Sequence, residues 1–307
     1  MTTLVDVKRS VTNNARHPDE DTSDQVLSRI AALAPMVARL APETEQGRRL
    51  PAELVSALRS ARIYGMLVPR RYGGLELDAP SAFRAVTALA RLDGSVGWNA
   101  MIGHIGSVIP FMASPALCDE VFHDRKDRII AGSAQPVGTA DCVPGGWRVT
   151  GVWPFASGCQ NAEWIVGTCV MREGGSPIDA SDRPGPMIRT CVVPAEHWEI
   201  RDTWHTVGLR GTGSHHVALT DVFVPHENIC EFPFGTSFAP VPMFSRFPQV
   251  MVLAHGAHAV GIAEGAIMDL VEVAGGGVKQ MFMTTPLAET ERFKEGLARL
   301  DADLRAA

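Results

Sequence analysis

The segment GLRGTGS at 208–214 combines glycines with side chains that can hold a polar ligand. Its three glycines allow another group to approach the backbone closely, and Arg210, Thr212 and Ser214 can each donate a hydrogen bond. A plain hairpin would explain the glycines, but not the combination Arg-Gly-Thr-Gly-Ser. The pattern therefore favours a loop that binds a phosphate, a hydroxylated chain or the polar edge of a ring.

A second segment, GVWPFASG at 151–158, places Trp153, Phe155 and Ser157 close together in the chain. An oriented hydroxyl in a dry aromatic pocket is suited to protecting a reactive ligand from side reactions. A tight β-turn with a packed tryptophan is the alternative explanation for the same residues.

The histidines and cysteines do not form a metal-binding pattern. None of the six cysteines belongs to a C-x-x-C pair, and His255 and His258 lack a third ligand in sequence. His215 and His216 are neighbours on a predicted strand, so they point to opposite faces. We therefore predict no metal site. His104, on a predicted apolar helix, could act as a base near neutral pH, although a lone histidine there is usually a core residue.

The composition of the 307 residues is that of an ordinary globular protein, with 46% hydrophobic and 20% charged residues. A formal net charge of −6 and the lack of a Lys/Arg run argue against a nucleic-acid surface. No apolar run approaches the length of a membrane span, so we expect no membrane segment. Unpaired cysteines and a polar start fit a reducing compartment, so we expect a cytoplasmic protein.

The pattern of the chain changes twice, which predicts an α+β protein. Residues 1–22 read as a flexible leader, and helical spacing of apolar residues dominates 23–127. Short runs rich in Val, Ile, Thr and Trp fill 128–240 and predict an antiparallel sheet or barrel, with an exposed loop at 174–186. Helical spacing returns over 241–307. This order, without G-x-G-x-x-G or a Walker sequence, excludes a dinucleotide fold of alternating strands and helices.

Several segments in this order resemble the acyl-CoA dehydrogenase superfamily. They are LPAELVSALRSARIYGMLVPRRYGG, DGSVGW, AGSAQP, GVWPFASG and DTWHTVGLRGTGSHHVALTDVFVP. Within the superfamily, the chain is most similar to the oxygenase components of two-component flavin monooxygenases, which hydroxylate phenols. The resemblance implies an N-terminal helical domain, a central antiparallel β-barrel or sheet, and a C-terminal helical bundle that is incomplete here.

The resemblance also implies a role for individual residues. Trp153 and Phe155 would flank the flavin, and Ser157 would hydrogen-bond its reactive ring nitrogen and take part in catalysis. His104 would be the base or hydrogen-bond partner for the substrate hydroxyl. The remaining implied flavin contacts are Ser133, Gln135, Trp204, Arg210, Thr212, Ser214 and Arg246.

The implied activity is that of a monooxygenase. Reduced FMN or FAD, delivered by a separate flavin reductase, would react with O₂ to hydroxylate a small aromatic molecule. Relatives of this type are usually homotetramers, and the apolar stretch at 250–274 fits a buried interface.

Two alternatives stay open at the level of sequence. An acyl-CoA dehydrogenase would use a glutamate base, for which Glu264 on the long predicted helix is the available residue. A chain that truly ends near 307 would lack the helices that close the bundle in relatives, and would then be an inactive flavoprotein-like fragment with apolar faces exposed.

Overall fold

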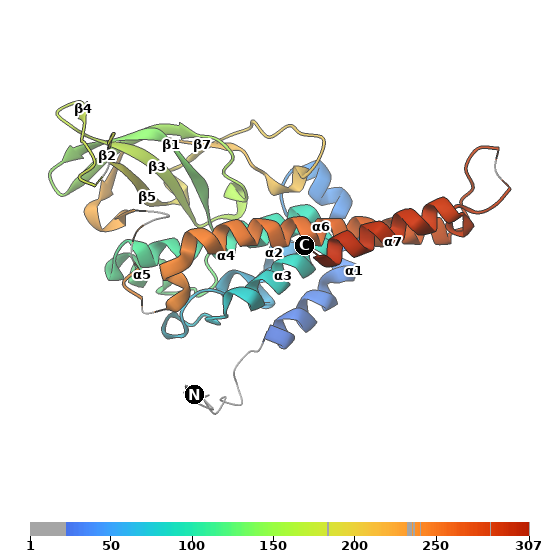
Figure 1. Ribbon diagram of the computed structural model, residues 1–307. Helices are drawn as coiled ribbons and strands as arrows, with labels where there is room; N and C mark the ends of the chain where they lie inside the picture. The colour runs from blue at the N-terminus through green and yellow to red at the C-terminus, as the bar shows by residue number, and fades with distance from the viewer. Residues whose placement is uncertain are drawn as a thin grey trace, which may run out of the picture.

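The computed structural model describes residues 23–306 except 183, 232–234, 236, 240 and 283, so the predicted leader at 1–22 lies outside the described residues. Figure 1 shows one twisted sheet lying beside a group of helices, with α6 running along the boundary between them. The order of elements is helices, then strands, then helices, as the sequence predicts.

Five α-helices form the N-terminal region: α1 (Ser23–Gly47), α2 (Ala52–Ser60), α3 (Ala79–Leu92), α4 (Gly94–Gly106) and α5 (Pro115–Phe122). Side-chain caps fix three of their starts, because Asp78, Asp93 and Ser114 each accept a hydrogen bond from a backbone N–H three residues later. α4 ends at Gly106. A 3₁₀ turn at Ile109–Met112 follows, where Pro110 lacks the N–H that an α-helix needs.

The central strands form a single sheet with the order β6-β7-β2-β1-β3-β5-β8, and β4 pairs with β3. The strands are β1 (Ile130–Val143), β2 (Gly146–Trp153), β3 (Trp164–Glu173), β4 (Ser176–Pro177), β5 (Ile188–Pro194), β6 (Glu199–Arg201), β7 (His216–Pro225) and β8 (Ile229–Cys230).

The prediction of a wholly antiparallel sheet was wrong at one pairing. The β1–β3 pair is parallel, whereas the other pairings are antiparallel. The reason is the connection: β2 returns beside β1, and the segment at 154–163 then carries the chain across so that β3 enters from the same end as β1. That crossing segment contains Phe155 and Ser157.

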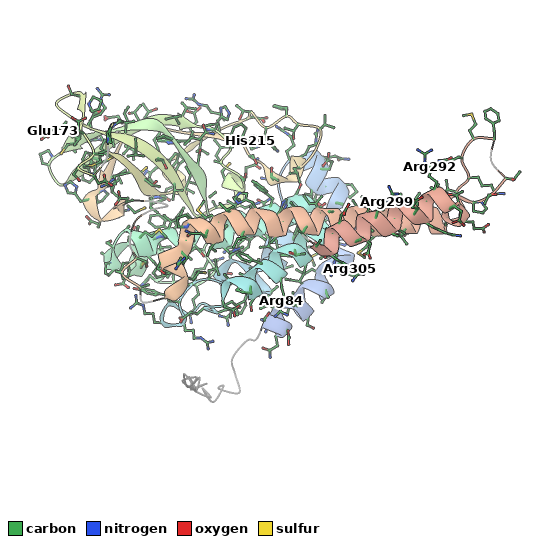
Figure 2. All side chains as sticks on the ribbon, viewed as in Figure 1. Arg84, Glu173, His215, Arg292, Arg299 and Arg305 are labelled. Carbon is green, nitrogen blue, oxygen red and sulfur yellow. The ribbon has the colours of Figure 1, made fainter. Side chains whose placement is uncertain are left out.

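Two long helices follow the sheet. α6 (Phe247–Gly275) packs against α3 and α4, where Thr87 Oγ1 donates to the Ala257 carbonyl at 3.0 Å and His258 Nε2 lies 2.9 Å from the Gly94 carbonyl. α7 (Glu291–Ala306) lies along α6 and has no buried residue. Figure 2 shows Arg292, Arg299 and Arg305 spread along α7, away from the sheet.

One stretch in the described part of the chain, Met243–Gly275, is long and apolar enough to cross a membrane by length and composition alone. This differs from the expectation that no run reaches such a length. The core helix of a protein that meets no membrane passes the same test, so the finding carries little weight.

Candidate functional site

Two strained loops meet at the edge of the sheet that faces α4. Phe155 and Leu209 both have a positive φ, at 61° and 52°, which side chains with a Cβ rarely adopt. The loops hold each other, because Ala156 N–H donates to the His215 carbonyl at 2.9 Å and Gly158 N–H donates to that of Thr212 at 2.8 Å. Strain that the surroundings enforce in this way is typical of functional sites.

Three buried hydroxyls join the two loops, and we call Ser157, Ser214 and Thr212 the hydroxyl chain. Ser157 Oγ lies 2.7 Å from Ser214 Oγ, which lies 2.7 Å from Thr212 Oγ1. Thr212 Oγ1 donates to the Leu209 carbonyl at 2.9 Å. The sequence analysis named each of these residues as an implied flavin contact, but it did not predict that they bond to one another.

Trp98 on α4 connects the hydroxyl chain to α6. Its indole Nε1–H donates to Ser157 Oγ at 2.9 Å. Its ring contacts His255 and His258 edge-on, with centroid distances of 5.4 and 5.1 Å. Burial lowers the pKa of His258, so this ring is neutral near pH 7.

Phe155 presents an aromatic ring to solvent beside the hydroxyl chain. Its side chain is 57% exposed although its backbone is strained, an arrangement that packing within the chain does not explain. Trp204 and His216 stand edge-on to this ring with centroids 6.3 Å away. An exposed ring next to an ordered hydroxyl can bind a flat, partly polar ligand.

An apolar cavity of about 140 Å³ lies between α4, the start of β1, β3 and α6. Its lining is mostly aliphatic, and we call it the apolar cavity: Ile102, Ile105, Gly106, Ile109, Ile130, Ala131, Gly132, Ser133, Ala134, Val166, Met251 and His255. Ser133 and His255 are the polar side chains among these residues. Such a cavity suits a small apolar molecule that carries one or two polar groups.

His255 offers this cavity a hydrogen-bond acceptor. Its Nδ1 lies 2.7 Å from the Met251 carbonyl, and a carbonyl only accepts, so Nδ1 carries the hydrogen. In the neutral ring, Nε2 then holds a lone pair. Across the residues that the structure describes, no side chain or backbone group bonds to Nε2.

The predicted place of Trp153 beside the flavin was wrong. Trp153 is 0% exposed, its Nε1–H donates to the Thr168 carbonyl at 2.7 Å, and its ring packs on Trp198 inside the sheet. Residues two apart on a strand share a face, but β2 ends at Trp153, and the positive φ of Phe155 in the following turn leaves its ring exposed.

The catalytic role of His104 stays a prediction. Its side chain is 1% exposed, and Nδ1 lies 2.8 Å from the Ala100 carbonyl of its own helix. Burial lowers the pKa of His104 to about 4, so it is neutral at ordinary pH. Ile102, Ile105 and Gly106 reach the apolar cavity from α4, and His104 does not.

The other predicted contacts divide between the site and its surroundings. Ser133 lines the apolar cavity, whereas Gln135 is exposed on the irregular stretch of β1 between Ser133 and Gly138. Arg210 is tied to α1 through the carbonyl and carboxylate of Glu45, at 3.1 and 3.4 Å. Arg246 is exposed just before α6.

A charged cluster supports the loop at 202–216. Arg48 forms an ion pair with Asp202, and this hydrogen bond lowers the pKa of the Asp202 carboxyl to about 2. The backbone N–H groups of Thr203 and Trp204 donate to His215 Nδ1 at 3.2 and 3.3 Å, so Nδ1 is unprotonated. His215, labelled in Figure 2, is buried, and burial lowers its pKa. The cluster fixes the position of Trp204.

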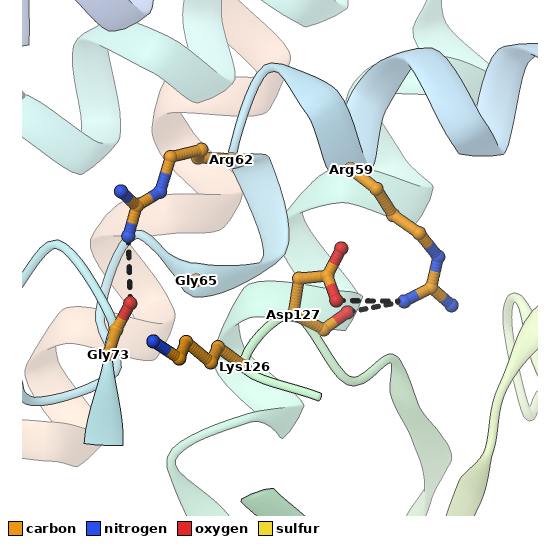
Figure 3. Close-up of a pocket in the computed structure, with 6 residues that line it drawn as sticks. All are labelled: Arg59, Arg62, Gly65, Gly73, Lys126 and Asp127. Carbon is orange, nitrogen blue, oxygen red and sulfur yellow. Dashed lines mark hydrogen bonds and ion pairs between the residues drawn. The ribbon is translucent and has the colours of Figure 1, made fainter. Parts of the chain in front are cut away.

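A larger cavity, of about 270 Å³, lies between α2, the Gly73 turn and the start of the sheet. Figure 3 shows Arg62 reaching the Gly73 carbonyl and Arg59 reaching Asp127. Arg59 also pairs with Glu163, so its charge fastens α2 to the sheet. This cavity shares no residue with the hydroxyl chain or the apolar cavity.

Two further chemistries gain no support from the arrangement. Within the described ranges, no group of three or more His, Cys, Asp and Glu side chains could hold a metal ion. Glu264, considered as a dehydrogenase base, faces α3 and lies 3.6 Å from Arg91.

Sequence reasoning missed Trp98 and considered His255 only as a metal ligand. Trp98 follows Gly97, whose Cα packs directly on Ala90 of α3, and such close helix packing orients the indole. No sequence pattern shows which residue a helix side chain meets on another element. The tautomer of His255 likewise depends on helix geometry, which brings its ring to the carbonyl four residues earlier.

The residues at this site fit a flavin. The exposed ring of Phe155 can stack on an isoalloxazine, and Ser157 lies two residues away on the same turn. The apolar cavity connects to the same place through Trp98, which contacts both Ser157 and His255. The exposed ring of Phe155 with the hydroxyl chain and the apolar cavity are therefore linked through one side chain, Trp98.

Comparison with known families agrees with this reading. Residues 23–118 match the family model "Acyl-CoA dehydrogenase, N-terminal domain", and residues 253–307 match "Acyl-CoA dehydrogenase, C-terminal domain".

Individual relatives are oxygenases. The chain is 32% identical over 298 residues to the flavin-dependent monooxygenase oxygenase subunit HsaA of Mycobacterium tuberculosis, covering 93% of this chain and 72% of the relative. It is 32% identical over 267 residues to the FADH(2)-dependent resorcinol hydroxylase oxygenase component of Rhizobium sp., covering 83% and 63%. The chain thus spans less than two thirds of the resorcinol hydroxylase.

Solved structures give the same result. XiaF from Streptomyces sp. in complex with FADH2 and glycerol superposes with a TM-score of 0.84 at 26% identity, covering 92% of this chain and 72% of XiaF. The HsaA monooxygenase from M. tuberculosis superposes with a TM-score of 0.81 at 30% identity, covering 93% and 73%.

Proposed function

We propose a function for this chain, which belongs to the acyl-CoA dehydrogenase-like oxygenase components of flavin-dependent monooxygenases. The chain binds a reduced flavin and hydroxylates a small aromatic molecule. The observation that carries the proposal is the exposed Phe155 ring on a strained backbone beside the hydroxyl chain. Bound reduced flavin would activate O₂ and supply the oxygen atom that enters the substrate.

The residues of this chain would bind and orient the reactants. Phe155 would stack on the isoalloxazine, and Ser157 would hydrogen-bond its N5 edge. The apolar cavity would hold the aromatic ring and exclude water, since most of its lining is aliphatic. Nε2 of His255 would accept a hydrogen bond from a phenolic hydroxyl and so orient the ring, which is the kind of role that the sequence suggested for His104.

We propose reduced FAD as the first flavin to test. The resorcinol hydroxylase is named as FADH(2)-dependent, and XiaF was solved with FADH2. Both named relatives are called an oxygenase component or subunit, which supports a separate reductase as the source of reduced flavin. The exposed apolar residues of α6 support a homo-oligomer as the working form.

The test is an anaerobic titration of the purified chain with reduced FAD and reduced FMN, followed by admission of O₂ with a panel of simple phenols. We expect binding of reduced flavin and a hydroxylated phenol that carries label from ¹⁸O₂. Phe155→Ala should weaken flavin binding roughly tenfold, because stacking with an aromatic ring contributes about 0.5–1.5 kcal/mol beyond the area it buries.

Phe223→Ala is the matched control, because Phe223 is also exposed (44%) but lies on β7 with its ring beside Arg148. It should bind flavin like the unaltered chain. If the unaltered chain binds neither reduced flavin, or if both phenylalanine variants bind equally well, the proposed flavin surface is wrong.

A further inference from the structure

An unbroken line of hydrogen bonds runs from Trp98 to Leu209 through the hydroxyl chain. Trp98 Nε1 lies 2.9 Å from Ser157 Oγ, the two inter-hydroxyl distances are both 2.7 Å, and Thr212 Oγ1 lies 2.9 Å from the Leu209 carbonyl oxygen. These side chains are buried or half-buried, so water does not compete freely with the bonds.

The two ends of this line determine where every hydroxyl proton points. A carbonyl oxygen can only accept, so Thr212 donates its proton to Leu209. Ser214 must then donate to Thr212, and Ser157 must donate to Ser214. The reverse order would leave two buried oxygens facing each other without a proton, which costs about 1–3 kcal/mol.

The acceptor end is firmly held. The Leu209 carbonyl also accepts from Trp204 Nε1 at 3.2 Å and from the Thr212 backbone N–H at 3.1 Å. The hydrogen bonds between the loops, Ala156 to His215 and Gly158 to Thr212, fix Ser157 relative to Ser214. The direction of the line is therefore a property of the fold.

Toward a ligand, Ser157 can act only as a hydrogen-bond acceptor. It already accepts from Trp98 and has given its only proton to Ser214, so a lone pair is what remains. An incoming group must donate a hydrogen bond to use it.

We propose that the hydroxyl chain makes this site select the reduced flavin over the oxidised flavin. N5 of a reduced isoalloxazine carries a hydrogen and donates, whereas N5 of the oxidised ring only accepts and would meet the lone pair of Ser157. Ser157 is the contact, and Ser214 and Thr212 are positioning residues that set its polarity. The inference rests on the proposed function, because it requires a flavin beside Phe155.

The experiment compares dissociation constants for oxidised and reduced FAD under anaerobic conditions. The unaltered chain should bind the reduced form more tightly. Ser214→Ala and Thr212→Val should each free a proton that Ser157 can offer to oxidised N5. Oxidised FAD should then bind roughly fivefold more tightly than it binds the unaltered chain, because one neutral hydrogen bond contributes about 1 kcal/mol. A tighter complex is not what simple damage to the site would produce.

Three further arms isolate the hydrogen bond itself. Thr212→Ser keeps the hydroxyl and should retain the original preference. Thr190→Val removes one hydroxyl from another buried pair, Thr168 and Thr190 at 2.8 Å in the sheet, and should leave the ratio of the two constants unchanged. Reduced 5-deaza-FAD has carbon in place of N5 and cannot donate, so it should bind the unaltered chain more weakly than reduced FAD but bind Ser157→Ala equally well.

The outcomes separate the two hypotheses. If neither form of FAD binds the unaltered chain, both the proposed function and the inference are wrong. If both forms bind with equal affinity, or if Ser214→Ala and Thr212→Val keep the original ratio, flavin binding stands and the inference is overturned.

Discussion

The two loops at the site and the outer face of α6 differ in what stabilises their backbone conformation. We define the outer face of α6 as Val252, Leu253, Val271 and Val273, whose side chains are 45–71% exposed. At the site, the loops at 155–158 and 209–215 are strained, but each is bonded to the other and to α4. On α6 the backbone needs no such support.

The difference follows from where the backbone hydrogen bonds go. A helix satisfies its own N–H and C=O groups, so α6 can form while much of its apolar surface stays uncovered. An irregular loop has no internal ladder, and it becomes ordered when neighbouring elements satisfy its polar groups. Changes at the site loops and the sheet beneath them should therefore disturb the fold, whereas changes on the outer face of α6 should not.

The largest contrast is expected between Trp153→Ala and Val252→Ala. Trp153 is 0% exposed beneath the site turn, and truncating a buried tryptophan costs about 3–5 kcal/mol in the free energy of unfolding. Val252 is 71% exposed in the single chain, and its truncation should change the free energy of unfolding of the monomer by less than about 0.5 kcal/mol. Chemical denaturation followed by far-ultraviolet circular dichroism measures both, and similar losses would contradict the contrast.

A smaller loss is expected on the inner face of α6 itself. A Cβ at Gly261 would lie 2.4 Å from the Thr87 carbonyl oxygen on α3, which is backbone and cannot move aside cheaply. Gly261→Ala should therefore destabilise the protein by about 1–3 kcal/mol, as overpacking of a core usually does. The same denaturation experiment measures this, and a stability equal to the unaltered chain would show that α6 does not pack tightly on α3.

A third effect should depend on pH. The folded protein holds the pKa of His104 near 4, below its usual 6.5, so the unfolded chain binds the extra proton and stability falls as pH decreases through this window. From pH 7 to pH 5 this group should remove about 2 kcal/mol. His104→Leu should lose less stability than the unaltered chain over that interval, and parallel losses in unfolding free energy would show that His104 is accessible to water.

The structure shows which features of the fold could be predicted from the sequence. Helical spacing of apolar residues predicted the helical region at 23–127 and its change to short strands, because those signals are local. The parallel β1–β3 pairing was missed, because it depends on how the segment at 154–163 crosses the sheet. Local patterns could not separate Trp153 from Phe155 either, because strand alternation predicts one face for both, and the turn after β2 leaves Phe155 exposed.

At the candidate site, too, local residue patterns were predictable and contacts between distant segments were not. The residue types in GLRGTGS and GVWPFASG singled out Thr212, Ser214 and Ser157 as candidate ligand contacts, and the structure brings the three hydroxyls together. Their mutual hydrogen bonds, and the part played by Trp98, required the packing of α4 against both loops. His104 and His255 have similar local surroundings in sequence, and the neighbouring elements decide that one is enclosed and the other lines a cavity.

The smallest expected effect has the opposite sign and gives the sharpest test of the comparison. Gly256 also lies inside α6, five residues before Gly261, but a Cβ there would meet nothing within 4 Å. Gly256→Ala should stabilise the protein by about 0.5–1 kcal/mol, because alanine loses less backbone entropy in a helix. A loss of stability at high protein concentration would mean that another copy of the chain covers this face, and dilution to monomers would then have to restore the expected gain. One helix would thus respond in opposite directions on its two faces, which local sequence alone cannot produce.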